Sequence, residues 1–121
     1  MIGKIVCPDG CGLEFELSFF NKMHFIDFAM KQLGHKDICI LSGPRCDKHN
    51  AQVNGVNNSA HKRGIAADIE YNGHAHLFIL CVVCILSGIR RLGINFKEHF
   101  IHIDEGTEKD GYPTPCLFPY N

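Results

Sequence analysis

Three side chains with metal-binding chemistry stand in or beside predicted strands. His61 follows a loop rich in Asn and Gly, Asp68 comes seven positions later within "IAADIEY", and His102 lies in "FIHIDEG". Histidine is the commonest metal ligand among side chains, and the chain has 8 histidines in 121 residues. A His, Asp and His trio leaves the fourth position of a tetrahedral zinc ion for water, as in catalytic sites. Such an ion polarises a carbonyl group and activates water.

Alternating apolar residues predict that two of these side chains lie on strands. Within residues 65–71, apolar residues alternate so that Asp68 points to the polar face of the strand. Residues 100–106 also alternate, with His102 and Asp104 on one face and isoleucines on the core face. We therefore expect Asp68 and His102 to share one face of a sheet.

Two apolar segments predict helices that cover this sheet. Residues 19–33 have apolar side chains at three- and four-residue spacing, with Ser18 as a cap and Gly34 just past the end. Residues 75–90 include an unbroken apolar run from 77 to 86. This run is shorter than the roughly 20 residues that cross a bilayer, so it predicts a buried helix and no membrane span.

The remaining segments complete an α+β prediction. Residues 37–43 predict a buried strand, residues 44–64 a loop with one helical turn, and residues 109–121 an irregular, proline-rich tail. A chain of 121 residues fits a single domain, which we assign to residues 1–121. The predicted fold is a small, mainly antiparallel sheet with flanking helices and the metal on its open face.

The amino-acid composition indicates which binding partners and which cellular compartment to expect. Charged residues make up 21% and apolar residues 45%, with a net charge of -1, so neither disorder nor nucleic-acid binding is expected. The odd number of cysteines, 7, fits a reducing compartment. Met1 is followed by "IGKIVCPDG", which lacks the apolar core of a signal peptide, so we expect synthesis in the cytoplasm without a secretory signal. Oligomeric state is left open.

The cysteines allow two structural roles. Cys7 and Cys11 flank the turn "PDG", and with Cys46 or Cys116 they would form either a second metal site or, in an oxidising setting, a disulfide. A zinc ribbon has two paired C-x2-C knuckles, which this chain lacks, so the sequence gives structural zinc little support.

Three motifs resemble those of a known family. "SGPRC" (42–46), "NSAHKRGIAADI" (58–69) and "FIHIDEG" (100–106) are similar in order and spacing to motifs of the M15 family of zinc D-alanyl-D-alanine peptidases. The resemblance is strongest to its short, phage-type branch, and the N-terminal "CPDGCG" extends it across nearly the whole chain. It implies a zinc metallopeptidase, with one zinc per chain, that cuts stem peptides or cross-links of bacterial peptidoglycan.

The resemblance also implies roles for individual residues. It makes His61, Asp68 and His102 the zinc ligands. Arg45, in the "SGPR" turn, corresponds to the arginine that binds the peptide substrate, and Ser59 shapes the ligand loop beside it.

The general base is the position where this chain departs from better-known branches. Those branches have an acidic residue three positions before the last ligand, and here that position is His99. Histidine accepts a proton near neutral pH, so we predict that His99 is the base. Glu98 is adjacent. Asp104 is either a partner that orients His102 or an alternative base.

Two other functions stay open. The departure at His99 favours a catalytically silent metal- or peptide-binding module of the same fold. The lack of a signal peptide allows a peptidase that acts on a peptide outside the wall. A wall enzyme made in the cytoplasm would act only when delivered or released, as in phage lysis.

Overall fold

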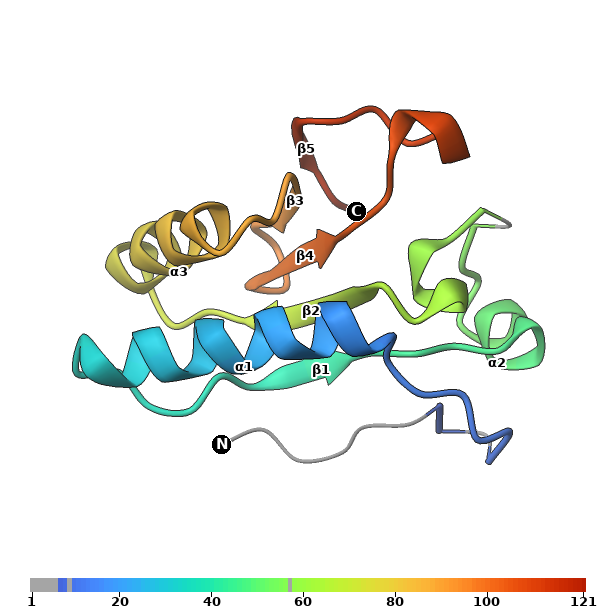
Figure 1. The fold of residues 1–121 in the computed structure, drawn as a ribbon, viewed down its shortest axis with the longest axis horizontal. Coiled ribbons are helices and arrows are strands. Elements are labelled where there is room, and N and C mark those ends of the chain that lie inside the picture. Colours follow the sequence, from blue (N-terminus) through green and yellow to red (C-terminus); the bar gives the residue numbers. More distant parts are fainter. Residues whose placement is uncertain (1–6, 9, 57) are drawn as a thin grey trace.

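The computed structural model describes residues 7–8, 10–56 and 58–121 (Figure 1). The expectation about a signal peptide falls largely on residues 1–6, outside the described residues. In chain order the elements are α1 (Leu17–Gln32), β1 (Ile40–Ser42), α2 (Asp47–Gln52), the 3-10 helix η1 (Ala60–Arg63), β2 (Ala66–Glu70), α3 (His74–Leu86), β3 (Arg91–Asn95), β4 (Phe100–Asp104), the 3-10 helix η2 (Glu108–Asp110) and β5 (Cys116–Pro119).

The strands form one sheet with the order β1-β2-β4-β3-β5. The pairs β1–β2, β2–β4 and β3–β4 are antiparallel, whereas β3 and β5 are parallel. The α+β prediction with a mainly antiparallel sheet is therefore confirmed. In the central pair Asp68 lies opposite His102, and Ala66 lies opposite Asp104.

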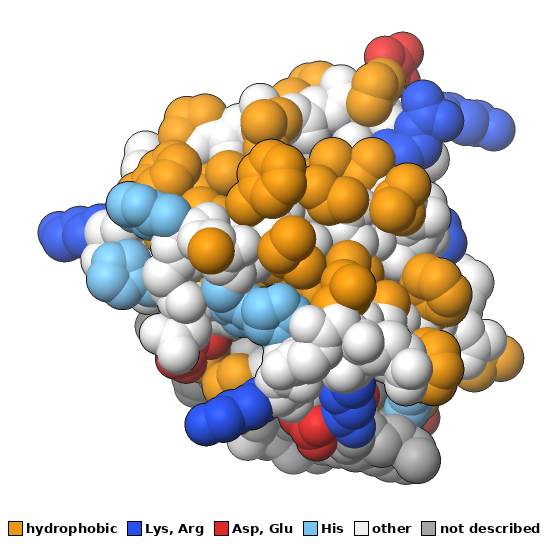
Figure 2. Space-filling model, turned by 90° about the vertical axis from the view of Figure 1, so that its left-hand side faces the viewer, with side chains coloured by type: hydrophobic (Ala, Val, Ile, Leu, Met, Phe, Trp, Pro, Cys, Tyr) orange, Lys and Arg blue, Asp and Glu red, His pale blue; other side chains and the backbone are white. Residues whose placement is uncertain are grey.

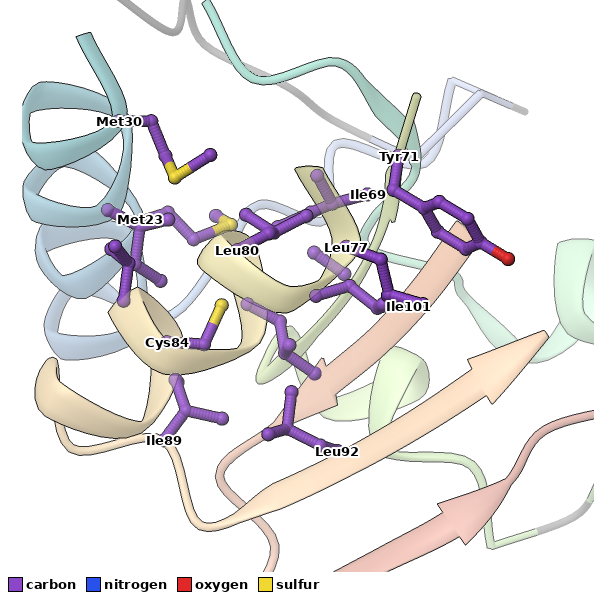
Figure 3. Close-up of a cluster of buried hydrophobic side chains, with 14 of the residues drawn as sticks. Met23, Met30, Ile69, Tyr71, Leu77, Leu80, Cys84, Ile89, Leu92 and Ile101 are labelled. Atoms are coloured by element: carbon purple, nitrogen blue, oxygen red, sulfur yellow. The ribbon is translucent and has the colours of Figure 1, made fainter. Parts of the chain in front are cut away.

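The hydrophobic core lies between one face of the sheet and the helices α1 and α3 (Figure 3). Ile69 of β2 and Ile101 of β4 face this core, as the alternation predicts, and both are fully buried. Because successive strand residues point to opposite faces, Asp68 and His102 point away from the helices. The core thereby determines which face carries the polar side chains.

Helix α1 confirms the helix predicted over residues 19–33, but it begins two residues earlier than predicted. It begins at Leu17, so Ser18 lies in its first turn and is not the cap. Glu16 occupies the cap position, and the Ser18 hydroxyl donates a hydrogen bond of 2.7 Å to its carboxylate. Gly34 follows the helix with φ at +89°, a left-handed conformation that glycine adopts without steric cost.

Helix α3 is buried on one side only, which corrects the expectation of a buried helix over residues 75–90. Leu80 and Cys84 are fully buried, but Phe78 and Leu86 are 67% and 77% exposed. Figure 2 shows hydrophobic side chains gathered on the side of the molecule where α3 lies. Within the described residues, no helix is long and apolar enough to cross a membrane.

Three other predictions need correction. Strand β1 is shorter than residues 37–43, because the Ile38 amide donates to the Asp27 carboxylate at 2.9 Å rather than to a strand. Residues 44–64 contain two short helices, each begun by a side-chain cap: Cys46 accepts from an α2 amide and Ser59 from an η1 amide. The tail contains β5, which pairs with a strand about 25 residues away in the sequence.

Candidate metal centre

His61, Asp68 and His102 converge at one point. One ligand atom from each lies within 4.8 Å of the others, and all three residues are buried. The register of β2 and β4 places Asp68 opposite His102, while η1 brings His61 in immediately before β2. The rings of the two histidines are 5.1 Å apart, edge to face. The structure therefore brings together the three residues predicted to be metal ligands.

The loop before β2 holds His61 in one orientation. Its Nδ1–H donates to the Gly43 carbonyl oxygen at 2.8 Å, and the Ser59 hydroxyl accepts from its amide at 3.2 Å. Gly64 ends η1 with φ at +71°, and a Cβ there would lie 2.5 Å from the Glu14 carbonyl oxygen. This close approach requires glycine. Ser59 thus holds the amide of a candidate ligand, and its role at the substrate-binding site stays a prediction.

The other ring nitrogen of His61 is available to a metal. Nε2 is buried and has no hydrogen-bond partner among the described residues, and the nearest carboxylate oxygen, of Asp68, is 3.4 Å away. Burial lowers the pKa of His61, although Asp68 acts in the opposite direction. The imidazole is therefore neutral near pH 7, which is the form that binds metal. A buried nitrogen without a partner needs a ligand, and a metal ion fits it.

His102 lies between two carboxylates. Its Nδ1 is 3.0 Å from Asp68 Oδ1, and its Nε2 is 2.7 Å from Asp104 Oδ2. The other oxygen of Asp104 accepts hydrogen bonds of 2.8 Å from Arg91 Nε and the Gly106 amide. Asp104 therefore orients the ring so that Nδ1 faces the ligand cluster, the role that carboxylates have beside metal-bound histidines.

The charges of this cluster suit a divalent cation. Burial alone would raise the pKa of Asp68, but the close contacts with His102 at 3.0 Å and with His61 at 3.4 Å outweigh it and lower this pKa to about 2. Burial also opposes ionisation of Asp104, and the interaction with His102 nevertheless lowers its pKa. Two nitrogen ligands and one ionised carboxylate form a donor set that is found in catalytic zinc sites.

A cleft of about 600 Å³ opens beside Asp68. Arg45 lines it and is only 7% exposed; its Nη1 donates to Asn50 Oδ1 at 3.2 Å, while its buried Nε has no partner among the described residues. A Cβ at Gly55 would lie 2.0 Å from the same Asn50 oxygen and 2.8 Å from Arg45 Nη1, so a side chain there would displace this pair. Other polar residues of the lining include Ser59, Glu98 and Tyr120.

The structure places His99, the predicted base, and its neighbour Glu98 differently. Glu98 lines the cleft. His99 is exposed in the turn between β3 and β4, with φ at +61°, and its ring lies 5.6 Å from that of Tyr71. The structure does not place His99 with the three candidate ligands.

Tyr120 is a site residue that the sequence analysis missed. Its ring stacks on His102 with centroids 4.3 Å apart and planes 11° apart. Burial raises the pKa of Tyr120, and the charge of Asp68 acts in the same direction. A signal was present in the alternating aromatic residues Phe118 and Tyr120, which are typical of a strand.

A His, Asp, His cluster on the open face of an antiparallel sheet, oriented by a carboxylate and adjoining an arginine-lined cleft, defines a candidate metal-dependent hydrolase. The family model of Peptidase M15 matches residues 10–104. The chain belongs to the Peptidase M15 family, and it is therefore a hydrolase of the metallopeptidase class. A search of curated proteins finds no match.

Proposed function

We propose that the protein is a zinc metallopeptidase that hydrolyses peptide bonds in the stem peptides or cross-links of bacterial peptidoglycan. The single observation that carries the zinc assignment is the buried Nε2 of His61, which has no hydrogen-bond partner in the described part of the chain and is grouped with Asp68 and His102. A zinc ion bound there supplies a Lewis acid that polarises the scissile carbonyl and activates water.

Arg45 is the proposed substrate-binding residue. Its guanidinium lines the cleft and is held there by a hydrogen bond from Nη1 to Asn50 Oδ1. Guanidinium groups bind carboxylates and carbonyls through paired donors in one plane. A substrate with a carboxylate beside the scissile bond matches this arrangement, which supports D-alanyl-D-alanine termini. The resemblance of residues 42–46 and 58–69 to the phage-type branch supports lysis or wall penetration as the setting.

We assign proton transfer to Glu98, a residue of the cleft wall. Glu98 lines the same cleft as Asp68 and Arg45, so we assign its carboxylate the acceptance of a proton in that cleft. His99, preferred from the sequence, stays a prediction that a comparison of variants tests. Asp104 is 1% exposed, with both oxygens bonded, so we assign it the orientation of His102 rather than the acceptance of a substrate proton.

A silent metal- or peptide-binding module is the second candidate. It is favoured by His99, because this residue replaces the acidic base of better-known branches and lies in an exposed turn. Such a module would keep the metal centre and the Arg45 cleft and would bind wall peptides without cutting them.

The experiment combines zinc-loaded protein with purified peptidoglycan, with peptides ending in D-Ala-D-Ala, and with an L-peptide library. Release of D-alanine or of new amino groups from the first two substrates supports the proposal, and His61→Ala should abolish it. Binding without hydrolysis at full zinc occupancy would establish the silent module. Cleavage of the L-peptides alone would establish a peptidase that acts outside the wall.

A further inference from the structure

We propose that Cys7, Cys11 and Cys46 bind a second zinc ion that has a structural role. Their Sγ atoms all lie within 4.8 Å of one another, in a cluster separate from the His61 site. Two of these thiols come from the N-terminal turn, and the third begins α2, 39 positions further along the chain than Cys7. This site goes beyond the proposed peptidase activity.

The distance between the sulfur atoms distinguishes a metal site from a disulfide. Zinc–sulfur bonds of about 2.3 Å in a tetrahedron place two sulfur atoms about 3.8 Å apart. The Sγ atoms of Cys7 and Cys46 are 3.7 Å apart. A disulfide would require about 2.05 Å. All seven cysteines lie in the described part of the chain, and each is a thiol.

Two backbone amides donate hydrogen bonds to sulfur atoms of this cluster. The Cys46 amide donates to Cys7 Sγ at 3.3 Å, and the His49 amide donates to Cys46 Sγ at 3.5 Å. Donors aimed at sulfur favour the charged form, which is the form that binds a metal. These N–H to sulfur hydrogen bonds are a second observation, separate from the distances between the sulfur atoms, and they also indicate a metal ion.

His49 lies near this cluster without joining it. It follows Cys46 by three positions and lines the same small hollow as Pro8, the neighbour of Cys7. Its ring nitrogens are not grouped with the three sulfur atoms, so the described residues supply three thiolate ligands and leave the fourth position of a tetrahedral ion to water.

A metal at this cluster would hold the cleft wall in place. Cys46 directly follows Arg45, and the Arg45 amide donates to the His61 carbonyl oxygen at 2.9 Å. The N-terminal turn would thus be tied to the segment that carries Arg45, the proposed substrate-binding residue. Through the Arg45 amide it would also be tied to the backbone of His61, a candidate ligand of the other metal. A bond that closes a long loop in a small chain contributes directly to folding free energy.

The test is X-ray absorption at the zinc edge of the full-length protein, together with zinc analysis. The parent should contain two zinc equivalents and show scattering from sulfur at about 2.3 Å. The variant His61→Ala/His102→Ala should keep the sulfur-bound zinc, and Cys7→Ser/Cys11→Ser/Cys46→Ser should lose it. Cys39→Ser/Cys116→Ser removes two thiols outside the cluster and should change nothing.

Two results would overturn the inference. The first is the absence of sulfur scattering from the zinc-loaded parent. The second is the titration of five rather than seven thiols after unfolding in chelator without reductant, because this count would reveal a disulfide. If the triple variant is insoluble, Cys11→Ser replaces it. This thiol is exposed, and its loss should weaken zinc binding at least tenfold. Loss of wall-peptide hydrolysis alone would not affect this inference, because the readout is the metal's sulfur ligands.

Discussion

Replacing Asp104 with asparagine tests whether this carboxylate orients the metal ligand or transfers the proton. Asp104 accepts three hydrogen bonds: one from His102 Nε2 and two, on its other oxygen, from Arg91 and Gly106. An asparagine side chain has one oxygen and one NH2 group. Whichever way the amide turns, its NH2 group must face a donor, either His102 or the Arg91–Gly106 pair.

We expect this conflict to weaken metal binding at the candidate ligands. If the NH2 group faces His102, Nε2 must become an acceptor, so the ring proton moves to Nδ1, the nitrogen that faces the ligand cluster. If it faces Arg91 and Gly106, two buried donors lose their acceptor. Substitution of such a partner typically costs 10- to 100-fold in metal affinity, or about 1.4–2.8 kcal/mol. We expect zinc affinity to fall by this factor.

The assay is competition for zinc with a chelating fluorophore at fixed pH, followed by peptide hydrolysis at saturating zinc. Asp104→Asn should bind zinc more weakly and recover activity when zinc is in excess. Asp110→Asn is the matched control, because this carboxylate also contacts an arginine, Arg63, but is exposed. Zinc affinity equal to that of the parent, with activity lost at full occupancy, would refute our reasoning and make Asp104 the base.

The other predictions concern the cleft. Arg45→Lys should raise KM or lower kcat for wall peptides at least tenfold with unchanged zinc content, since lysine supplies one point charge instead of paired planar donors; an unaltered rate would exclude Arg45 from substrate binding. Glu98→Gln should lose on the order of a hundredfold in rate at matched zinc occupancy while His99→Ala loses little, and the reverse order would establish His99 as the base. Tyr120→Phe should keep zinc affinity because the ring still stacks on His102. Tyr120→Ala should lower this affinity about two- to tenfold, and equal affinities of the two variants would show that the stack does not support the ligand.

The parts of the site that could be predicted from the sequence are those determined by the alternation of apolar and polar residues along a strand. In β2 and β4 every second residue enters the core, so Ile69 and Ile101 require Asp68 and His102 to lie on the opposite face. The pairing of these two strands then brings the polar residues together. Nothing beyond strand periodicity and a hydrophobic core was needed for this step.

The parts that could not be predicted depend on contacts between distant segments. Parallel pairing of β5 with β3 has no hairpin turn to indicate it, and prolines at 113, 115 and 119 favour an irregular tail. The direction of the Glu98 and His99 side chains depends on the conformation of one turn, where His99 has positive φ. The spacing to His102 alone therefore does not tell which of the two adjacent residues, Glu98 or His99, lines the cleft.

The two sides of the site therefore have different structural origins. The metal side is formed by η1, β2 and β4, whose side chains are fixed by the core beneath them and by Asp104, and it lies within the residues matched by the family. The cleft side adds Tyr120, which follows β5 and lies beyond the matched residues. Tyr120 nevertheless contacts His102 directly through its stacked ring. A change in the tail can therefore alter both the shape of the cleft and the support of a candidate ligand, while a change on the helix side of the sheet acts on the ligands only through the position of β2 and β4.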